Sequence, residues 1–286
     1  MRGPRRLLPA LVGIGVVAAL LGALLPGCDW PEGTRYVRPV FDQVDVTRDV
    51  VYRHTTNSEG QAVDLKLDIY QPRGDTAAKR PAVMWMFGGA WVTGNKSQMA
   101  NYATDSAKRG YVGISIDYRI RPNAGGNFLD GALDAYDDAV AAVQWIKDHA
   151  STYRIDPRAI VAAGYSAGAI NALNLLYMPG NRGPATSPVA GAVAIAGLAF
   201  NAPTRGDPPA LMNSGTNDNI VPFASAKRTC DSAVSVGDVC RFWSYENAGH
   251  EIGITQISVL QERAGDFIFE HVLIPLGYRA TAPAAT

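Results

Sequence analysis

Ser166 stands at the centre of a Gly-x-Ser-x-Gly sequence, where a serine hydroxyl can act as a nucleophile. An apolar, β-branched run at 158–163 precedes the motif, and an alanine- and leucine-rich stretch at 169–177 follows it. This order predicts a strand, a sharp turn and a helix, with the serine at the turn. Gly164 and Gly168 suit a strained turn, because a Cβ at either position would collide with neighbouring backbone. An ordinary strand-to-helix turn with an exposed serine remains the alternative.

A serine nucleophile needs a general base, and the chain has only four histidines. We expect His54, in an early strand-like stretch, and His149, at the end of an amphipathic helix, to be surface or helix-end residues. His271 falls within a C-terminal helical pattern, which favours a partly buried or capping role. His250 follows a strand-like run at 241–245 and lies on a loop, where an α/β sheet presents catalytic groups. It is therefore the candidate base.

A carboxylate usually holds such a histidine in the correct tautomer. One of the carboxylates between Ser166 and His250, Asp218, follows a buried strand at 210–214 and lies in the loop beyond its carboxyl end. It is the predicted acid, although a turn aspartate that only satisfies backbone amides is the alternative. The other candidates by position are Asp207, Asp231, Asp238 and Glu246.

A glycine-rich sequence, Phe87-Gly88-Gly89-Ala90, follows a strand-like run at 81–86. It resembles the His-Gly-Gly-Gly loop of lipases and carboxylesterases. The resemblance implies that the N–H groups of Gly89 and Ala90, with that of Ala167, bind an oxyanion, and that Gly88 gives the backbone room to turn. Phe87 replaces the histidine of that loop, whose side chain normally bonds to nearby backbone, whereas phenylalanine can only pack.

Together, the serine motif, this loop and the Asp-Tyr-Arg sequence at 117–119 resemble α/β-hydrolases of the carboxylesterase and esterase–lipase type, over about residues 50–277. The resemblance implies a triad in the chain order Ser166, Asp218, His250. It also implies a serine carboxylesterase that hydrolyses short-chain acyl, acyl-sugar or aromatic-acid esters with water, without metal or organic cofactor. The alternatives are a serine peptidase of the prolyl-oligopeptidase type and a non-catalytic binding lipoprotein.

Short apolar runs alternate with helical patterns along the chain, which predicts an α/β fold with a mainly parallel, eight-stranded sheet and helices on both faces. Segments 44–52 and 62–70 alternate apolar and polar residues, as antiparallel edge strands do. The connections are short, so we expect no large cap domain. The expected organisation is a linker at 28–49, one catalytic domain at 50–279 and a disordered tail at 280–286. The net charge of zero gives no indication of nucleic-acid binding, and no obligate protein partner is evident.

The first 27 residues have the pattern of an export signal, with a basic start followed by an apolar run at 7–25. The sequence Leu25-Pro26-Gly27-Cys28 resembles a bacterial lipobox, which predicts a lipid on Cys28 and attachment to the membrane of the cell envelope. An uncleaved membrane anchor is the main alternative for this segment, and a twin-arginine signal is another. Without a lipid anchor, the protein would be secreted or periplasmic.

Three cysteines are present, so lipidation of Cys28 would leave Cys230 and Cys240 as an even pair. We expect them to form a disulfide, with two free thiols in a reducing compartment as the alternative. Five aromatic residues near the motifs could line a substrate pocket, although core packing is the more common role: Trp85, Trp91, Tyr118, Tyr165 and Phe223.

Overall fold

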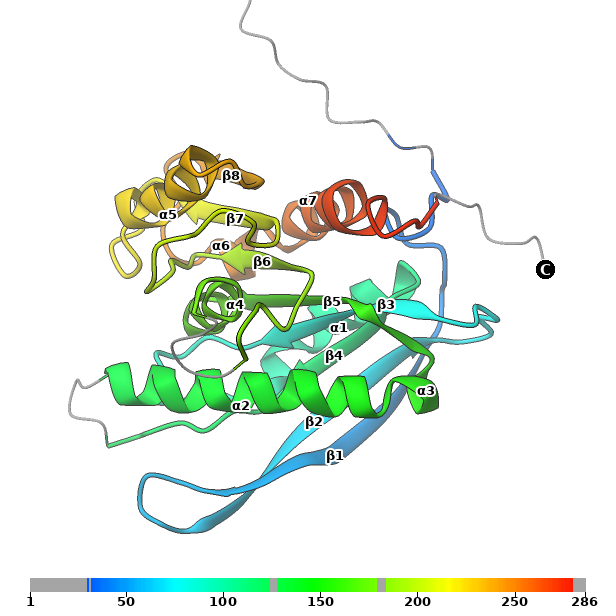
Figure 1. Ribbon diagram of the computed structural model, residues 1–286, viewed down its shortest axis with the longest axis horizontal. Coiled ribbons are helices and arrows are strands. Elements are labelled where there is room, and N and C mark those ends of the chain that lie inside the picture. The colour runs from blue at the N-terminus through cyan, green and yellow to red at the C-terminus, as the bar shows by residue number, and fades with distance from the viewer. Residues whose placement is uncertain (1–29, 31, 124–127, 179–183, 280–286) are drawn as a thin grey trace, which may run out of the picture.

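Eight strands form one sheet in the order β1-β2-β4-β3-β5-β6-β7-β8 in the computed structural model, which describes residues 30, 32–123, 128–178 and 184–279 (Figure 1). β1 pairs antiparallel with β2, and β2 with β4, while every other pair is parallel. The predicted, mainly parallel eight-stranded sheet is therefore found. The strands are β1 (Val44–Thr56), β2 (Ala62–Pro72), β3 (Arg80–Met86), β4 (Val112–Ile116), β5 (Ile155–Tyr165), β6 (Gly191–Ile195), β7 (Ala210–Gly215) and β8 (Cys240–Tyr245).

Helices cover both faces of this sheet, as predicted. α1 and α7 pack against each other on one face, and α2 and α4 pack against each other on the opposite face (Figure 1). α5 lies against β7 and β8. The helices are α1 (Ala100–Lys108), α2 (Phe128–Asp148), α3 (Ala150–Tyr153), α4 (Ala167–Tyr177), α5 (Phe223–Ser235), α6 (Ile252–Thr255) and α7 (Ile257–Ile268), with a 3₁₀ turn at Lys96–Met99 and a π turn at Phe269–Leu273.

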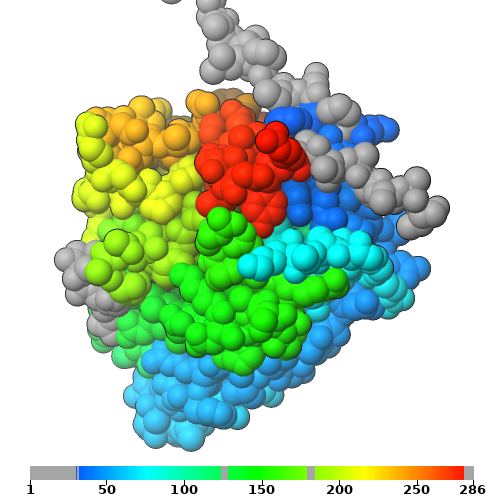
Figure 2. Space-filling view, turned by 45° about the vertical axis from the view of Figure 1, so that its right-hand side comes forward, coloured from blue at the N-terminus to red at the C-terminus, as the bar shows by residue number. Residues whose placement is uncertain are grey.

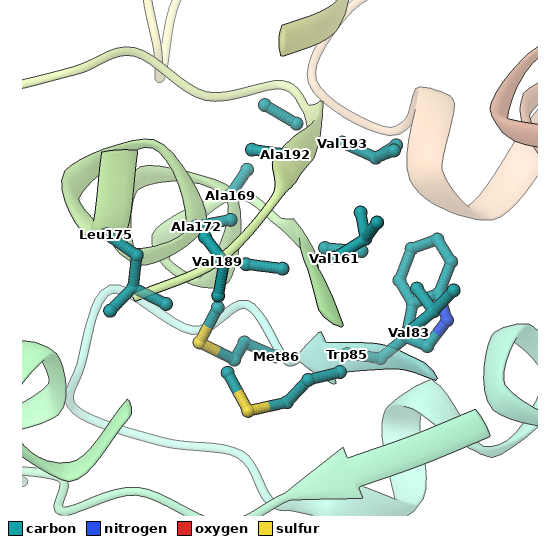
Figure 3. Close-up of a cluster of buried hydrophobic side chains, with 14 of the residues drawn as sticks. Val83, Trp85, Met86, Val161, Ala169, Ala172, Leu175, Val189, Ala192 and Val193 are labelled. Atoms are coloured by element: carbon teal, nitrogen blue, oxygen red, sulfur yellow. The ribbon is translucent and has the colours of Figure 1, made fainter. Parts of the chain in front are cut away.

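The core lies on both sides of the central strands, which are mainly apolar because helices cover both of their faces. Every residue of β3, β4 and β6 is buried. Figure 3 shows side chains of β3, β5 and β6 meeting those of α4, whose residues Ala169, Ala172 and Leu175 are fully buried. α4 is therefore held rigidly against the sheet, and so is the turn from which it starts.

The strand register brings the ends of β3, β4 and β5 to the same level. Met86 pairs with Ile116 of β4 on one side and with Gly164 of β5 on the other. Because the three strands are parallel, the segments that follow them emerge side by side at the carboxyl edge of the sheet. Those segments are the glycine-rich loop, the Asp-Tyr-Arg sequence and the serine turn.

Residues 32–41, which we call the N-terminal strap, pack on the amino edge of the sheet, at the far end from the serine turn. Val37 is fully buried, and its carbonyl accepts a hydrogen bond from Arg109. Arg38 pairs with Asp266 of α7 at 2.6 Å. Figure 2 shows the strap in blue beside the red C-terminal helix. Part of the segment predicted as a linker therefore belongs to the folded body, and β1 begins at Val44.

Candidate active site

Ser166 occupies a strained turn between β5 and α4. Its φ is 55° and its ψ is −121°, a backbone conformation that costs energy for a residue with a Cβ. The N–H of Ser166 donates to Ile195 of β6 at 2.9 Å, which ties the turn to the next strand. A Cβ on Gly164 would lie 2.3 Å from the carbonyl carbon of Gly168, and one on Gly168 would lie 2.1 Å from the Met86 oxygen. The predicted need for glycine on both sides is therefore confirmed.

His250 and Asp218 lie in line with the serine. The Nε2 atom of His250 is 2.8 Å from Oγ of Ser166, and its Nδ1 atom is 2.8 Å from Oδ2 of Asp218. Both residues lie on loops that follow parallel neighbouring strands, β8 and β7. The three side chains that the sequence singles out are thus within hydrogen-bond reach of one another.

The Asp218 carboxylate is fixed in place by backbone amides. Its Oδ1 atom accepts hydrogen bonds of 2.9 Å from the N–H groups of Ile220 and Val221, so Oδ2 is directed at the histidine. Asp218 is 4% exposed. The neighbouring N–H of Asn217 donates to Ala248 at 2.9 Å, which joins the loop of the acid to the loop of the histidine.

Tyr165 supports the histidine from the serine turn. Its hydroxyl donates to the carbonyl of His250 at 3.0 Å, and the two rings lie 5.4 Å apart. Burial raises the pKa of Tyr165, and the negative charge of Asp218 raises it further, so the phenol keeps its proton and remains a donor. The residue before the serine therefore positions the loop that carries His250.

The other histidines lie away from this cluster. His54 is on β1 and bonds to Asp64 at 2.7 Å, and the His149 ring stacks on Trp145 at 4.0 Å. His271 lies in the π turn, where burial lowers its pKa. These placements agree with the surface and helix-end roles expected from the sequence.

The other carboxylates that lie between Ser166 and His250 in the sequence do not contact His250: each is bonded to another group or exposed. Asp231 pairs with Lys227 at 2.7 Å, Asp207 accepts from the N–H of Thr204, Asp238 accepts from the N–H of Gly206, and Glu246 is exposed on the β8 loop.

The glycine-rich loop lies against the serine turn. A Cβ on Gly88 would be 3.0 Å from the Cβ of Ser166. Gly89 has a φ of 128°, and a Cβ there would lie 2.1 Å from the carbonyl oxygen of Thr93, so glycine is required at this position. The N–H groups of Gly89, Ala90 and Ala167 donate to no acceptor among the described residues. Three free donors therefore belong to segments that meet at Ser166.

Tyr118 holds the glycine-rich loop in place at Phe87. The two rings stack with centroids 4.0 Å apart, and the Tyr118 hydroxyl donates to the Phe87 carbonyl at 2.7 Å. Burial raises the pKa of Tyr118 well above its ordinary value, so the hydroxyl stays protonated. The side chain at position 87 only packs, as expected, and a hydrogen bond to the loop comes instead from the segment that follows the neighbouring strand β4.

Buried ion pairs hold the segment after β4 against α2. Asp138 of α2 is fully buried and receives hydrogen bonds from Arg119 and from Arg53 of β1. Burial raises the pKa of Asp138, and the two guanidinium groups act in the opposite direction. Arg121 adds a bond from its N–H to the Trp91 carbonyl at 2.7 Å. Tyr118 is thus carried by a segment that is anchored on both sides.

The five candidate pocket aromatics have different surroundings. Trp91 donates from Nε1 to Asn171 of α4, and Tyr118 and Tyr165 contact the loop and His250 as described. Trp85 lies in the core and bonds to Ser106, and Phe223 packs on Phe242. No motif in the sequence singles out Asn171, whose contact with Trp91 depends on the packing of α4 against the loop.

Cys230 and Cys240 form the predicted disulfide, between α5 and the start of β8. Cys28 and the rest of the signal-like segment lie outside the described residues. Within the described ranges, no group of three or more His, Cys, Asp or Glu side chains is arranged to hold a metal ion. None of the helices in those ranges is both long and apolar enough to cross a bilayer.

Solved structures with the same architecture include an esterase of Thermogutta terrifontis, Est2, in a propionate-bound form. The two chains superpose with a TM-score of 0.68 at 26% identity, over 83% of this chain and 96% of that one. This chain is an α/β-hydrolase of the esterase–lipase type. The same esterase has been solved with butyrate and after phosphorylation by paraoxon, with TM-scores of 0.68 in both cases.

The sequence matches of this α/β-hydrolase are shorter. The family described as BD-FAE matches residues 67–180. Phenmedipham hydrolase of Pseudarthrobacter oxydans is 37% identical over 120 residues, which is 40% of this chain and 23% of the relative. Carboxylesterase 5A of Ovis aries is 34% identical over 124 residues, 42% of this chain and 32% of the relative. The chain thus spans less than a third of the length of these curated relatives.

Proposed function

We propose that the chain is a serine carboxylic ester hydrolase with Ser166 as nucleophile, His250 as general base and Asp218 as the residue that orients the base. The observation that carries the proposal is the pair of 2.8 Å contacts that link the three side chains in series. In this arrangement Nδ1–H of His250 donates to Asp218, which leaves Nε2 free to accept the serine proton.

The proposed reaction is acyl transfer to water. As Oγ of Ser166 attacks the ester carbonyl, its proton passes to His250, and the negative charge on the carbonyl oxygen is held by the N–H groups of Gly89, Ala90 and Ala167. His250 then gives that proton to the leaving alcohol. A water molecule, deprotonated by His250, attacks the acyl-enzyme and releases the acid.

Short acyl groups are the proposed substrates, with acyl-sugar and aromatic-acid esters as the wider class. The support for short chains is that the Thermogutta terrifontis esterase was solved with propionate and with butyrate bound. Ser166 is 9% exposed. The connections at the carboxyl edge of the sheet that the structure describes contain no cap domain.

We also propose that the protein is exported and attached to the cell envelope by a lipid on Cys28. The support is the signal-like composition of residues 1–27 and the lipobox-like sequence that ends at this cysteine. Incorporation of an alkyne-labelled fatty acid into the wild type, and its loss in Cys28→Ala, is the expected result. Equal labelling of both proteins, or of neither, would contradict it.

The catalytic proposal is tested by measuring hydrolysis of p-nitrophenyl acetate and butyrate by the wild type and by Ser166→Ala. We expect the variant to lose essentially all turnover while its melting temperature stays close to that of the wild type. Paraoxon should phosphorylate the wild type on Ser166 and leave the variant unlabelled, as the solved esterase is itself phosphorylated by this reagent. Ser244→Ala, on β8 and exposed, is the matched control.

Turnover by Ser166→Ala near the wild-type level, or mass mapping that places the phosphoryl group on another residue, would remove Ser166 as nucleophile. A matched p-nitroanilide series separates esterase from peptidase activity, and we expect the ester to be hydrolysed far faster.

A further inference from the structure

The glycine-rich loop ends in a tight turn with an unusual backbone conformation. The carbonyl of Gly89 accepts a hydrogen bond of 3.0 Å from the N–H of Val92, which closes a four-residue β-turn. Its two central residues, Ala90 and Trp91, have φ values of 52° and 59°. Positive φ at both central positions is the pattern of a type I′ turn, which favours glycine, asparagine and aspartate. Alanine and tryptophan disfavour this conformation, so contacts from outside the turn must hold it.

Trp91 makes contacts that hold the turn. Its carbonyl accepts a hydrogen bond of 2.7 Å from the N–H of Arg121, and its indole Nε1–H donates to Oδ1 of Asn171 at 3.1 Å. α2 also packs closely on this residue, because a Cβ on Gly131 would lie 2.9 Å from the Cβ of Trp91. The bond to Asn171 ties the turn to α4, the helix that begins directly after Ser166.

The turn determines where one of the proposed oxyanion donors points. The N–H of Ala90 belongs to the peptide group that joins Gly89 to Ala90, so a change of φ at Ala90 would rotate that peptide and redirect the N–H. Ala167, another proposed donor, is the first residue of α4. Asn171, on the same rigid helix, therefore fixes the loop donor relative to both Ala167 and Ser166. Such donors need to stay within about 0.5 Å of the productive geometry.

Asn171 is an unfavourable choice for stability alone. Its side chain is fully buried, and its Nδ2 atom donates to no acceptor among the described residues. A buried amide group without a partner destabilises the folded state. An apolar side chain of similar size would fill the same space without that penalty. A buried polar group that is only half satisfied calls for a specific explanation, and a role in catalysis is one.

We propose that Asn171 is a positioning residue for the oxyanion loop. It holds the indole of Trp91, and through it the turn at 89–92, in the conformation that directs the N–H of Ala90 at the oxyanion. The inference rests on the proposed function, because it treats Ala90 as a donor to the carbonyl oxygen of an ester attacked by Ser166. Asn171 acts through Trp91 and makes no bond to the substrate.

The kinetic test uses Asn171→Leu, which removes the acceptor and keeps a side chain of similar volume. Complete loss of an oxyanion donor lowers kcat by about 10²–10³, and a displaced donor should cost less. On p-nitrophenyl acetate we therefore expect kcat to fall about ten- to a hundredfold, while KM changes less than about twofold.

Ser106→Ala is the matched control. Ser106 is buried on α1, on the opposite face of the sheet, and its hydroxyl accepts from the indole Nε1–H of Trp85 at 3.0 Å. The variant also leaves a buried indole without its acceptor, but far from the loop, so kcat should remain as in the wild type.

Binding of a trifluoromethyl ketone reports directly on the oxyanion. Oγ of Ser166 adds to the ketone carbon, the serine proton passes to His250, and the carbonyl oxygen becomes an oxyanion that the N–H donors hold. For 1,1,1-trifluoro-2-butanone, the inhibition constant should rise in Asn171→Leu by about the factor by which kcat/KM falls. Ser106→Ala should leave it unchanged. An unchanged inhibition constant in Asn171→Leu would overturn the proposal.

The double variant Asn171→Leu with Trp91→Phe separates positioning from stability. It removes both partners of the bond and leaves neither unsatisfied, so its melting temperature should be close to that of the wild type. Its kcat should nevertheless stay low, and Asn171→Leu should have no further effect on kcat in the Trp91→Phe background. If kcat recovers together with the melting temperature, the bond is only structural and the proposal is wrong.

Failure of this inference is distinct from failure of the proposed reaction. An active wild type whose kcat is retained in Asn171→Leu would overturn the role of Asn171 and leave the catalytic triad in place. A wild type that neither hydrolyses the ester nor binds the ketone would overturn the proposed reaction and, with it, this role.

Discussion

Tyr118 and Phe87 are joined twice, by parallel rings whose planes differ by 6° and by a hydrogen bond from the tyrosine hydroxyl to the phenylalanine carbonyl. The register explains the contact, since Met86 pairs with Ile116 and the two strands end at the same level. In the proposed mechanism the loop that begins at Phe87 supplies two of the oxyanion donors. The position of those donors therefore depends on a residue in the segment that follows a different strand, β4.

Removing only the Tyr118 hydroxyl should slow catalysis without unfolding the protein. Tyr118→Phe keeps the stacked ring and deletes one buried hydrogen bond, which is worth about 0.5–1.5 kcal/mol. If the bond positions the loop for the transition state, kcat should fall about two- to tenfold while KM changes little. The measurement is a steady-state comparison on p-nitrophenyl acetate.

Tyr111→Phe is the control for this variant, because Tyr111 is equally buried and its hydroxyl also donates to a backbone carbonyl, that of Tyr36 in the N-terminal strap. It should lower the melting temperature to a similar degree and leave kcat unchanged. Equal kcat values for both variants would mean that Tyr118 has only a structural role.

Asp218→Asn should reduce kcat by a factor on the order of 10³–10⁴. The asparagine oxygen can still accept from Ile220 and Val221, so the loop should keep its shape. The amide NH₂ would then face Nδ1 of His250 and favour the tautomer that carries its proton on Nε2, which cannot accept the serine proton. Asp231→Asn, an exposed carboxylate paired with Lys227, should behave as wild type. A loss of less than tenfold in Asp218→Asn would argue against the assigned acid.

Protonation of Asp75, which pairs with Arg35 of the N-terminal strap, should destabilise the protein in acid. Burial alone would raise the pKa of this carboxyl, but hydrogen bonds from Arg35 and Arg80 outweigh burial and hold the pKa well below its ordinary value. A depressed pKa means that the stabilisation is present above the unfolded pKa of about 3.9 and is lost as the pH falls below it. The melting temperature of the wild type should therefore drop between about pH 4 and pH 2.

The variant Asp75→Asn measures how much of the fall in melting temperature in acid is due to the Asp75 carboxyl. Near pH 7 the variant should be less stable by about 3–5 kcal/mol, because it leaves the fully buried Arg80 without its carboxylate. The gap between the two melting curves should close as the pH falls below about 4. Asp45→Asn, in an exposed pair with Arg73, should show no gap at any pH. A gap that stays constant down to pH 2 would contradict the ionised pair.

The order of strands and helices and the grouping of Ser166, Asp218 and His250 could be predicted, because each depends on local patterns. Buried strands are continuous apolar runs, and in a parallel sheet the residues that follow them share one edge. The bracing of the loop by Tyr118 could not be read from the chain. It depends on the register between β3 and β4, which brings together residues 31 positions apart.

The N-terminal strap escaped prediction for a related reason. It has no helical or strand periodicity, and its fixed position comes from single side chains that meet distant partners, such as Arg35 on Asp75 and Tyr36 on Tyr111. Such contacts leave no local signal in the sequence.

The disulfide between Cys230 and Cys240 should contribute stability without affecting the chemistry. Closing a loop with a sequence separation of 10 stabilises the fold by about 2–3 kcal/mol on the chain-entropy model, or roughly 5–10 °C in melting temperature. Cys240 begins β8 at the amino edge, whereas His250 follows its far end, so kcat at 25 °C should change less than twofold on reduction. Cys230→Ser combined with Cys240→Ser should melt at the lower temperature whether or not reductant is present. An equal loss of stability on adding reductant to this double variant would show that the effect does not come from the bridge.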